Sequence, residues 1–179
     1  KFIIAVLLLP VCVGAGQALW MVMRACGGAD VTLVPVAAGA ACWVVIYLLL
    51  PKPMWVYVFG HELTHALFAI LFGGSVKAFH ASEKGGQVHL TRSNFIITLA
   101  PYFFPLYTFF ALVAAWLARA ANAPALEPWL VLVAGAAFAF HIVLTAIFLQ
   151  TDQNDIREHG AFFSYPLIFL FNVILTALL

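Results

Sequence analysis

The sequence predicts an all-α polytopic membrane protein with about six transmembrane helices and one short β-hairpin. Composition supports this class, because 65% of the 179 residues are hydrophobic and only 8% are charged. A water-soluble domain usually carries about 25% charged residues. The mean hydropathy of +1.08 agrees with a membrane protein. The net charge of +1 comes without a basic stripe, so nucleic acid is not an expected partner.

Six apolar runs of about twenty residues each are the predicted spanning helices. They cover residues 2–23, 31–50, 54–72, 95–118, 128–149 and 161–179. The breaks between them are short and polar or contain proline or glycine, as in "RACGGAD", "PKP" and "ARAANAPALEP". The length of the first run suits a spanning helix better than a signal peptide. Because the loops are too small to fold separately, residues 1–179 are predicted to form a single integral membrane domain.

Two connections differ from simple loops. Residues 75–92, "SVKAFHASEKGGQVHLTR", alternate apolar and polar positions around "EKGG", which predicts a β-hairpin with a glycine turn. Residues 150–160, "QTDQNDIREHG", hold three of the seven acidic residues: Asp152, Asp155 and Glu158. This concentration of carboxylates suggests a functional role for the second connection.

The distribution of lysine and arginine gives an expected orientation. With six crossings, the side of the hairpin carries Arg24, Lys77, Lys84, Arg92 and Arg157, and the other side carries Lys1, Lys52 and Arg119. Five basic residues against three place the hairpin and the acidic connection in the cytoplasm. Short loops without an appended domain favour a prokaryotic protein of the inner (cytoplasmic) membrane.

The third apolar run contains ionisable residues, in the stretch "YVFGHELTHALFAILF" at 57–72. Such groups cost roughly 2.5–3.5 kcal/mol each to insert into a membrane, so a functional reason is expected. His61, Glu62 and His65 form an HExxH motif, whose i, i+4 spacing puts both imidazoles on one helix face, where they can bind one Zn²⁺. Glu62 then lies beside the metal and can act as general base. The alternative is a buried hydrogen-bonded polar cluster that holds helices together.

An HExxH motif in a membrane helix, followed by a hairpin and a later aspartate, resembles the M50, or site-2 protease, class of intramembrane zinc metalloproteases. The segment "FGHELTHALFAILFGG" carries most of the likeness. The N-x-x-P-x-P-x-L-D-G segment of better-known members is absent, and "TDQNDIREHG" takes its place. The chain therefore looks more like the M50B-like branch, over roughly residues 54–165.

A catalytic zinc ion needs a third protein ligand and an open position for water. The resemblance implies Asp155 as this ligand; Asp152 is an alternative, and either could instead be a solvated loop carboxylate. Depth argues against both, because His61 would lie about 11–12 Å along a spanning helix and the acidic connection would have to dip inward. His141, midway along the fifth apolar run, is predicted at a suitable depth but fits a packing role better.

The resemblance implies a zinc endopeptidase that cuts a transmembrane or membrane-adjacent segment of another protein within the lipid bilayer. The alternative is a non-catalytic membrane subunit that keeps the M50 fold and acts as a structural or assembly partner. A diiron enzyme is disfavoured, since such enzymes carry several histidine boxes and this chain has six histidines with one close pair. Serine and aspartyl intramembrane proteases also fit poorly, because the sequence has neither a GxSG nor a GxGD segment.

Overall fold

Helices make up most of the computed structural model, which describes residues 1–25 and 33–178. The helices are α1 (Phe2–Ala25), α2 (Leu33–Leu49), α3 (Met54–Leu71), α4 (Phe95–Leu99), α5 (Leu106–Ala120), α6 (Glu127–Phe148), α7 (Asn154–His159) and α8 (Ala161–Leu178). Two 3₁₀ turns are η1 (Ala100–Tyr102) and η2 (Pro124–Leu126), and the strands are β1 (Val76–Ser82) and β2 (Gly85–Leu90). The start of the predicted second helix at 31 and the end of the sixth at 179 lie outside the described residues.

The predicted class of helical membrane protein is confirmed, with slightly fewer spans than the expected six. Within the described ranges, four helices are long and apolar enough to cross a membrane: α1, α3, α8 and the run Pro124–Phe148 that contains α6. A bent pair formed by Phe95–Tyr102 and α5 would be a fifth span. Helix α2 has 17 residues and falls just short.

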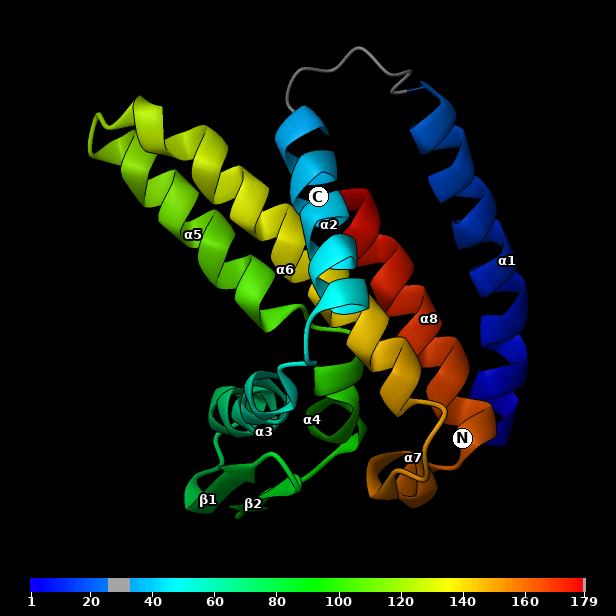
Figure 1. Cartoon of the computed structure of the whole chain (residues 1–179). Coiled ribbons are helices and arrows are strands. Elements are labelled where there is room, and N and C mark those ends of the chain that lie inside the picture. Colours follow the sequence, from blue (N-terminus) through cyan, green and yellow to red (C-terminus); the bar gives the residue numbers. More distant parts are fainter. Residues whose placement is uncertain (26–32, 179) are drawn as a thin grey trace.

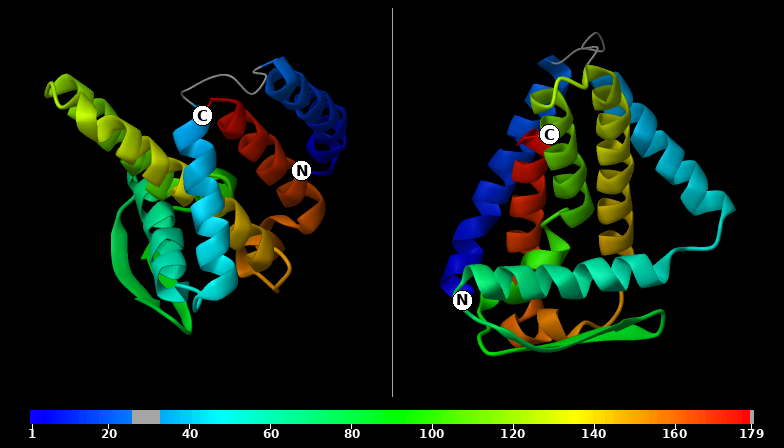
Figure 2. Two further views of the ribbon diagram at one scale, coloured as in Figure 1. Left: turned by 45° about the horizontal axis from the view of Figure 1, so that its top comes forward. Right: turned by 90° about the vertical axis from the view of Figure 1, so that its left-hand side faces the viewer.

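Helix α3 lies crosswise at one end of the bundle (Figures 1 and 2). In Figure 1, α3 is seen end-on, whereas α2, α6 and α8 are seen from the side, along their full length. In the right-hand view of Figure 2 it extends across the ends of α5, α6 and α8. Both strands of the hairpin pack against it, and α7 lies at the same end. Hydropathy predicted a spanning helix here, but the helix lies at the end of the bundle that carries the polar segments.

The predicted continuous helix at 95–118 is wrong, because the chain breaks between α4 and α5. The two parts differ in direction by 77°. Pro101 and Pro105 lie in the break, and proline removes a helical N–H and clashes with the preceding turn. Asn94 begins α4, since its side chain accepts hydrogen bonds from the backbone N–H groups of Ile96 and Ile97. The break leaves α4 and η1 packed against α3, while α5 leaves toward the far end of the bundle.

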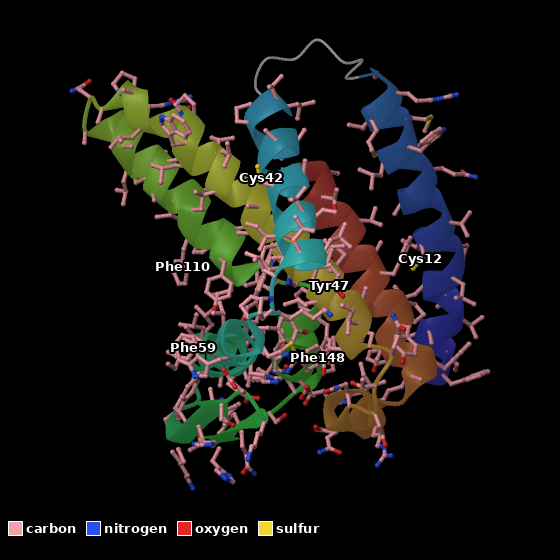
Figure 3. The ribbon with its side chains drawn as sticks, viewed as in Figure 1. Cys12, Cys42, Tyr47, Phe59, Phe110 and Phe148 are labelled. Atoms are coloured by element: carbon pink, nitrogen blue, oxygen red, sulfur yellow. The ribbon has the colours of Figure 1, made fainter. Side chains whose placement is uncertain are left out.

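Glycine allows α2 and α6 to pack closely. A Cβ added to Gly39 would lie 1.9 Å from the carbonyl oxygen of Leu132, and one added to Gly135 would lie 2.2 Å from that of Val36. Small residues at such crossings let helix backbones approach and increase van der Waals contact. Large apolar side chains point outward instead, as Figure 3 shows for Phe110, which is 48% exposed. Outward apolar side chains suit a lipid environment.

The predicted β-hairpin is confirmed as β1 paired antiparallel with β2. Ser82 pairs with Gly85, so the connecting turn is the dipeptide at 83–84. Gly85 has φ +139°, which an L side chain rarely adopts, and this explains the glycine after the turn. An irregularity between Val76 and Ala78 separates the last pair from the rest of the ladder.

The predicted sides of several basic residues are wrong because α3 does not cross the bundle. Lys1 lies at the α7 end, with its Nζ 2.9 Å from His159 Nδ1, and α1 carries Arg24 to the opposite end. Lys52 lies between α2 and the crosswise α3. The end of the hairpin therefore carries Lys1, Lys52, Lys77, Lys84, Arg92 and Arg157, and the other end carries Arg24 and Arg119. The corrected distribution is more one-sided than the predicted one.

Candidate metal centre

Three side chains from α3 and α7 bring their polar atoms together at the end of the bundle. His61 Nε2 and His65 Nε2 are 3.2 Å apart. Asp155 Oδ2 lies 3.3 Å from His61 Nε2 and 3.4 Å from His65 Nε2. One ligand atom from each residue falls within 4.8 Å of the other two, a spacing that could hold a metal ion. Two imidazoles and one carboxylate are donors that zinc accepts, and three ligands leave a position for water.

The local fold fixes the orientation of one of the two imidazoles, that of His65, for metal binding. His65 Nδ1 lies 2.9 Å from the carbonyl oxygen of Ile97, so the Nδ1–H donates to the backbone and leaves Nε2 free to bind a metal. Ile97 is presented by the first turn of α4, whose N–H groups are capped by Asn94. The chain break between α4 and α5 therefore places a carbonyl oxygen behind a histidine of the HExxH motif.

Asp155 belongs to the short helix α7, and its position is held by hydrogen bonds. The Tyr102 hydroxyl donates to Asp155 Oδ2 over 2.9 Å. Burial raises the pKa of the Asp155 carboxyl, but hydrogen bonds with His61 and His65 outweigh burial and hold the pKa below its ordinary value. Asp155 is therefore an anionic group directed at both imidazoles.

Glu62 lies beside this centre, beneath the hairpin. Its side chain is on the same helix as the two histidines, and the residue is 8% exposed. A Cβ added to Gly86 would lie 2.5 Å from Glu62 Cγ and 2.7 Å from Glu62 Oε1. The hairpin backbone thus covers the glutamate closely, and only glycine fits there. The arrangement limits the positions that the Glu62 carboxylate can take.

A largely polar cleft of about 410 Å³ opens next to the centre. His61, Glu62, His65 and Asp155 line it together with β2, the start of α4 and the connection before α7. The other polar or charged lining residues are Gln87, Ser93, Thr98, Asp152, Gln153, Asn154 and Glu158. The side chains of the HExxH motif therefore face a largely polar cleft.

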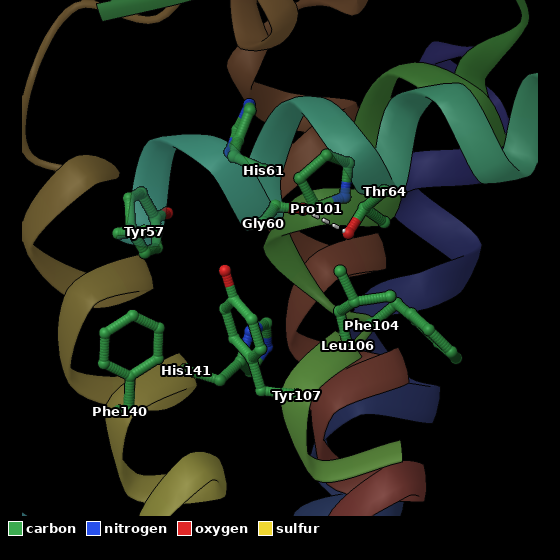
Figure 4. A pocket seen from close by; sticks show the side chains of 10 residues that line it. All are labelled: Tyr57, Gly60, His61, Thr64, Pro101, Phe104, Leu106, Tyr107, Phe140 and His141. Carbon is green, nitrogen blue, oxygen red and sulfur yellow. Dashed lines mark hydrogen bonds between the residues drawn. The ribbon is translucent and has the colours of Figure 1, made fainter. Parts of the chain in front are cut away.

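The two alternative ligands lie elsewhere. Asp152 is in the rim of the cleft, where it forms an ion pair with Arg157 and is mostly exposed. His141 is buried on α6 and lines a cavity of about 20 Å³ on the opposite side of α3, with Tyr107 and Phe140 (Figure 4). In that view the His61 side chain points away from His141. The structure therefore does not bring Asp152 or His141 into the group formed by His61, His65 and Asp155.

In the structure, the acidic connection does not have to dip inward between the helices to reach the histidines. The expected dip assumed that His61 lay deep within a spanning helix. Because α3 lies across the end of the bundle, α7 reaches the histidines from that same end (Figure 1). The connection also folds into the helix α7 rather than inserting as an irregular loop between helices.

Three contributions to the site carried no signal in the sequence. These are the Tyr102 hydroxyl, the Ile97 carbonyl oxygen and the close approach of Gly86 to Glu62. Pro101 and Pro105 lie in the chain break next to Tyr102, but the position of a proline does not indicate which side chain a break presents. Contacts of this kind depend on how distant segments pack.

The fold and the site define a membrane protein of the metalloprotease type, with an HExxH helix and a distant aspartate. The chain belongs to the peptidase M50B-like family, whose model matches residues 31–151. This match includes the HExxH motif and ends before Asp155. No curated protein and no solved structure gives a significant match.

Proposed function

We propose that this protein is a zinc-dependent endopeptidase that cleaves a segment of another membrane protein. The observation that carries the proposal is the convergence of His61, His65 and Asp155, with Glu62 beside them, on one polar cleft. Membership of a peptidase family supports the same chemistry. The donor set fits zinc, and the Nδ1 bond of His65 to a backbone carbonyl oxygen is typical of a metal-binding histidine.

Each residue then has a defined task. His61, His65 and Asp155 hold the ion, and zinc when bound supplies a Lewis acid and lowers the pKa of a coordinated water. Glu62 takes a proton from the attacking water and passes it to the leaving amine. The hairpin packs over the Glu62 side chain and limits the positions that its carboxylate can take.

The substrate that fits best is an extended, membrane-adjacent segment. The cleft lies at the end of the bundle with the polar hairpin and α7, and most of its lining side chains are polar or charged. Apolar substrate side chains would bury this lining without hydrogen-bond partners, which is unfavourable. Within the described sheet, β2 pairs with β1 only, and Gly86, Gln87 and Val88 of β2 line the cleft. The other edge of β2 can pair with an extended peptide, which would expose the scissile bond of that peptide to the attacking water.

The proposed location is the inner membrane of a prokaryote, with the cleft on the cytoplasmic side. Six of the eight lysines and arginines lie at the end of the bundle that carries the hairpin. An excess of such residues marks the cytoplasmic face of membrane proteins.

The test combines metal analysis with a search for cleavage. The protein is purified in detergent and its zinc content is measured by mass spectrometry. It is then incubated with two mixtures of synthetic peptides, one polar and one apolar, and products are identified by mass spectrometry. We expect about one zinc per chain and cleavage mainly in the polar mixture. Preference for the apolar mixture would contradict the membrane-adjacent substrate.

Four variants assign the roles. Changing both His61 and His65 to alanine should remove the zinc. Glu62→Gln should keep the zinc and abolish cleavage, because the amide keeps the shape of the side chain and loses the base. Asp155→Asn should weaken zinc binding, whereas the matched change Asp152→Asn at the rim should not. Unchanged zinc in the double histidine variant would refute the metal site, and zinc without any cleavage would favour a non-catalytic subunit.

A further inference from the structure

Tyr102 lies next to the candidate metal centre, and the sequence did not indicate a role for it. It is 0% exposed and lies in η1, directly after Pro101 in the chain break. Its hydroxyl is 2.9 Å from Asp155 Oδ2, and this same oxygen lies within 3.4 Å of both histidine Nε2 atoms. A hydroxyl buried at this place has to donate its hydrogen, because an unpaired buried hydroxyl is unfavourable.

The position of Tyr102 is fixed from three directions. Its ring meets the His61 ring edge-on, with centroids 5.0 Å apart. Its carbonyl oxygen accepts a hydrogen bond of 2.9 Å from Asn172 Nδ2 of α8. The hydroxyl is also 3.3 Å from Gln153 Oε1, in the connection before α7. The shorter bond goes to the carboxylate, and hydrogen bonds to ionised acceptors are the stronger ones.

We propose that Tyr102 is a positioning residue that orients Asp155 toward the two histidines. Tyr102 is fully buried: its ring packs edge-on against His61 of α3, and its backbone carbonyl oxygen is bonded to Asn172 of α8. The Asp155 side chain is 25% exposed on a six-residue helix, so the more firmly held tyrosine directs the carboxylate. One lone pair of Oδ2 accepts the tyrosine hydrogen, and this fixes the carboxylate plane with Oδ2 between the imidazoles. Partners of this kind behind a metal ligand typically change metal affinity by 10–100-fold. The inference rests on the proposed metal site and adds a residue that supports it.

The experiment measures zinc affinity by competition with a chromophoric chelator, for the full chain in detergent. Tyr102→Phe removes only the hydroxyl, and we expect its zinc dissociation constant to rise about 10–100-fold. The control is Tyr107→Phe, since the Tyr107 hydroxyl donates to the backbone oxygen of Val56 on α3 and does not reach Asp155. We expect less than about a threefold change there, because that bond does not orient a metal ligand.

Coupling to Asp155 separates positioning from a general structural role. If Tyr102 acts through the carboxylate, Tyr102→Phe should add little to the loss already caused by Asp155→Asn. A structural role would make the two losses multiply. The visible spectrum of Co²⁺ bound in place of zinc gives a second readout, and we expect it to change in Tyr102→Phe and not in Tyr107→Phe.

The outcomes are distinct for the two proposals. If the unaltered protein binds zinc and Tyr102→Phe binds it equally well, the inference is wrong and the proposed function stands. Independent losses in the double variant would also overturn the inference. If the unaltered protein binds no zinc or Co²⁺, the proposed function fails and the role of Tyr102 fails with it.

Discussion

Replacing Gly86 by alanine should impair catalysis while leaving the metal ligands intact. Gly86 pairs with Ala81 in the hairpin and lies directly over the Glu62 side chain. An added Cβ would be 2.5 Å from Glu62 Cγ, 2.7 Å from Glu62 Oε1 and 2.8 Å from Val58 Cγ1. None of these atoms belongs to His61, His65 or Asp155, so zinc content should stay the same.

The size of the effect follows from the displacement that the methyl group requires. Ordinary contacts of a Cβ atom begin at 3.4 Å, so the 2.5 Å contact needs a shift of about 3.4 − 2.5 = 0.9 Å. A misplacement of about 1 Å can reduce a catalytic rate by about 10²-fold. This corresponds to about 2.7 kcal/mol in the activation free energy. We therefore expect kcat to fall about 100-fold in Gly86→Ala.

The assay uses a peptide that was cleaved in the experiment with the two peptide mixtures. The values of kcat and KM are determined for each variant at full zinc loading. The control is Gly14→Ala, because an added Cβ at Gly14 of α1 meets no atom within 4 Å. A Gly86→Ala variant with zinc bound and more than half of the original kcat would refute the proposed packing of the hairpin on Glu62. Loss of zinc in that variant would also contradict it.

Two further predictions concern the elements that support the site. Asn94→Ala removes the acceptor for two N–H groups of α4 and should lower the free energy of unfolding by about 0.5–2 kcal/mol. It should also weaken zinc binding, because α4 carries the Ile97 carbonyl oxygen; Asn94→Asp keeps an acceptor and is the control, and equal thermal stability of Asn94→Ala would contradict the capping role. Gly39→Leu should separate α2 from α6 and reduce the yield of monodisperse protein on size exclusion, whereas Gly14→Leu should not. A normal yield for Gly39→Leu would contradict the close helix crossing.

Sequence reasoning succeeded where a property depends on residues close together in the chain. The hairpin at 75–92 follows from alternation and a glycine turn, and β1 and β2 form there. The i, i+4 spacing put His61 and His65 on one face, and their Nε2 atoms are 3.2 Å apart. Sequence reasoning was less successful at residues 95–118. The mean hydropathy of this segment is the same whether the helix is straight or broken at its prolines.

The third partner of the histidines shows where sequence reasoning reached its limit. Asp155 is 94 residues away from His61, so no local spacing relates them, and the resemblance to a family suggested it without geometry. A spanning α3 would hold the histidines too deep for Asp155 to reach, but α3 lies across the end of the bundle. Direction in space is a property of packing, which hydropathy does not record.

The sequence by itself determined that the chain is a helical membrane protein and that one helix carries two imidazoles and a glutamate on neighbouring positions. Both follow from short-range physics: the length of apolar runs and the 3.6-residue helical period. Tertiary structure alone decided that α3 lies across the end of the bundle, that Asp155 rather than Asp152 or His141 faces the histidines, and that Tyr102 and Gly86 contact the acidic residues. These features depend on contacts between distant segments, and such contacts form only where the whole chain can pack its helices and satisfy its buried polar groups together.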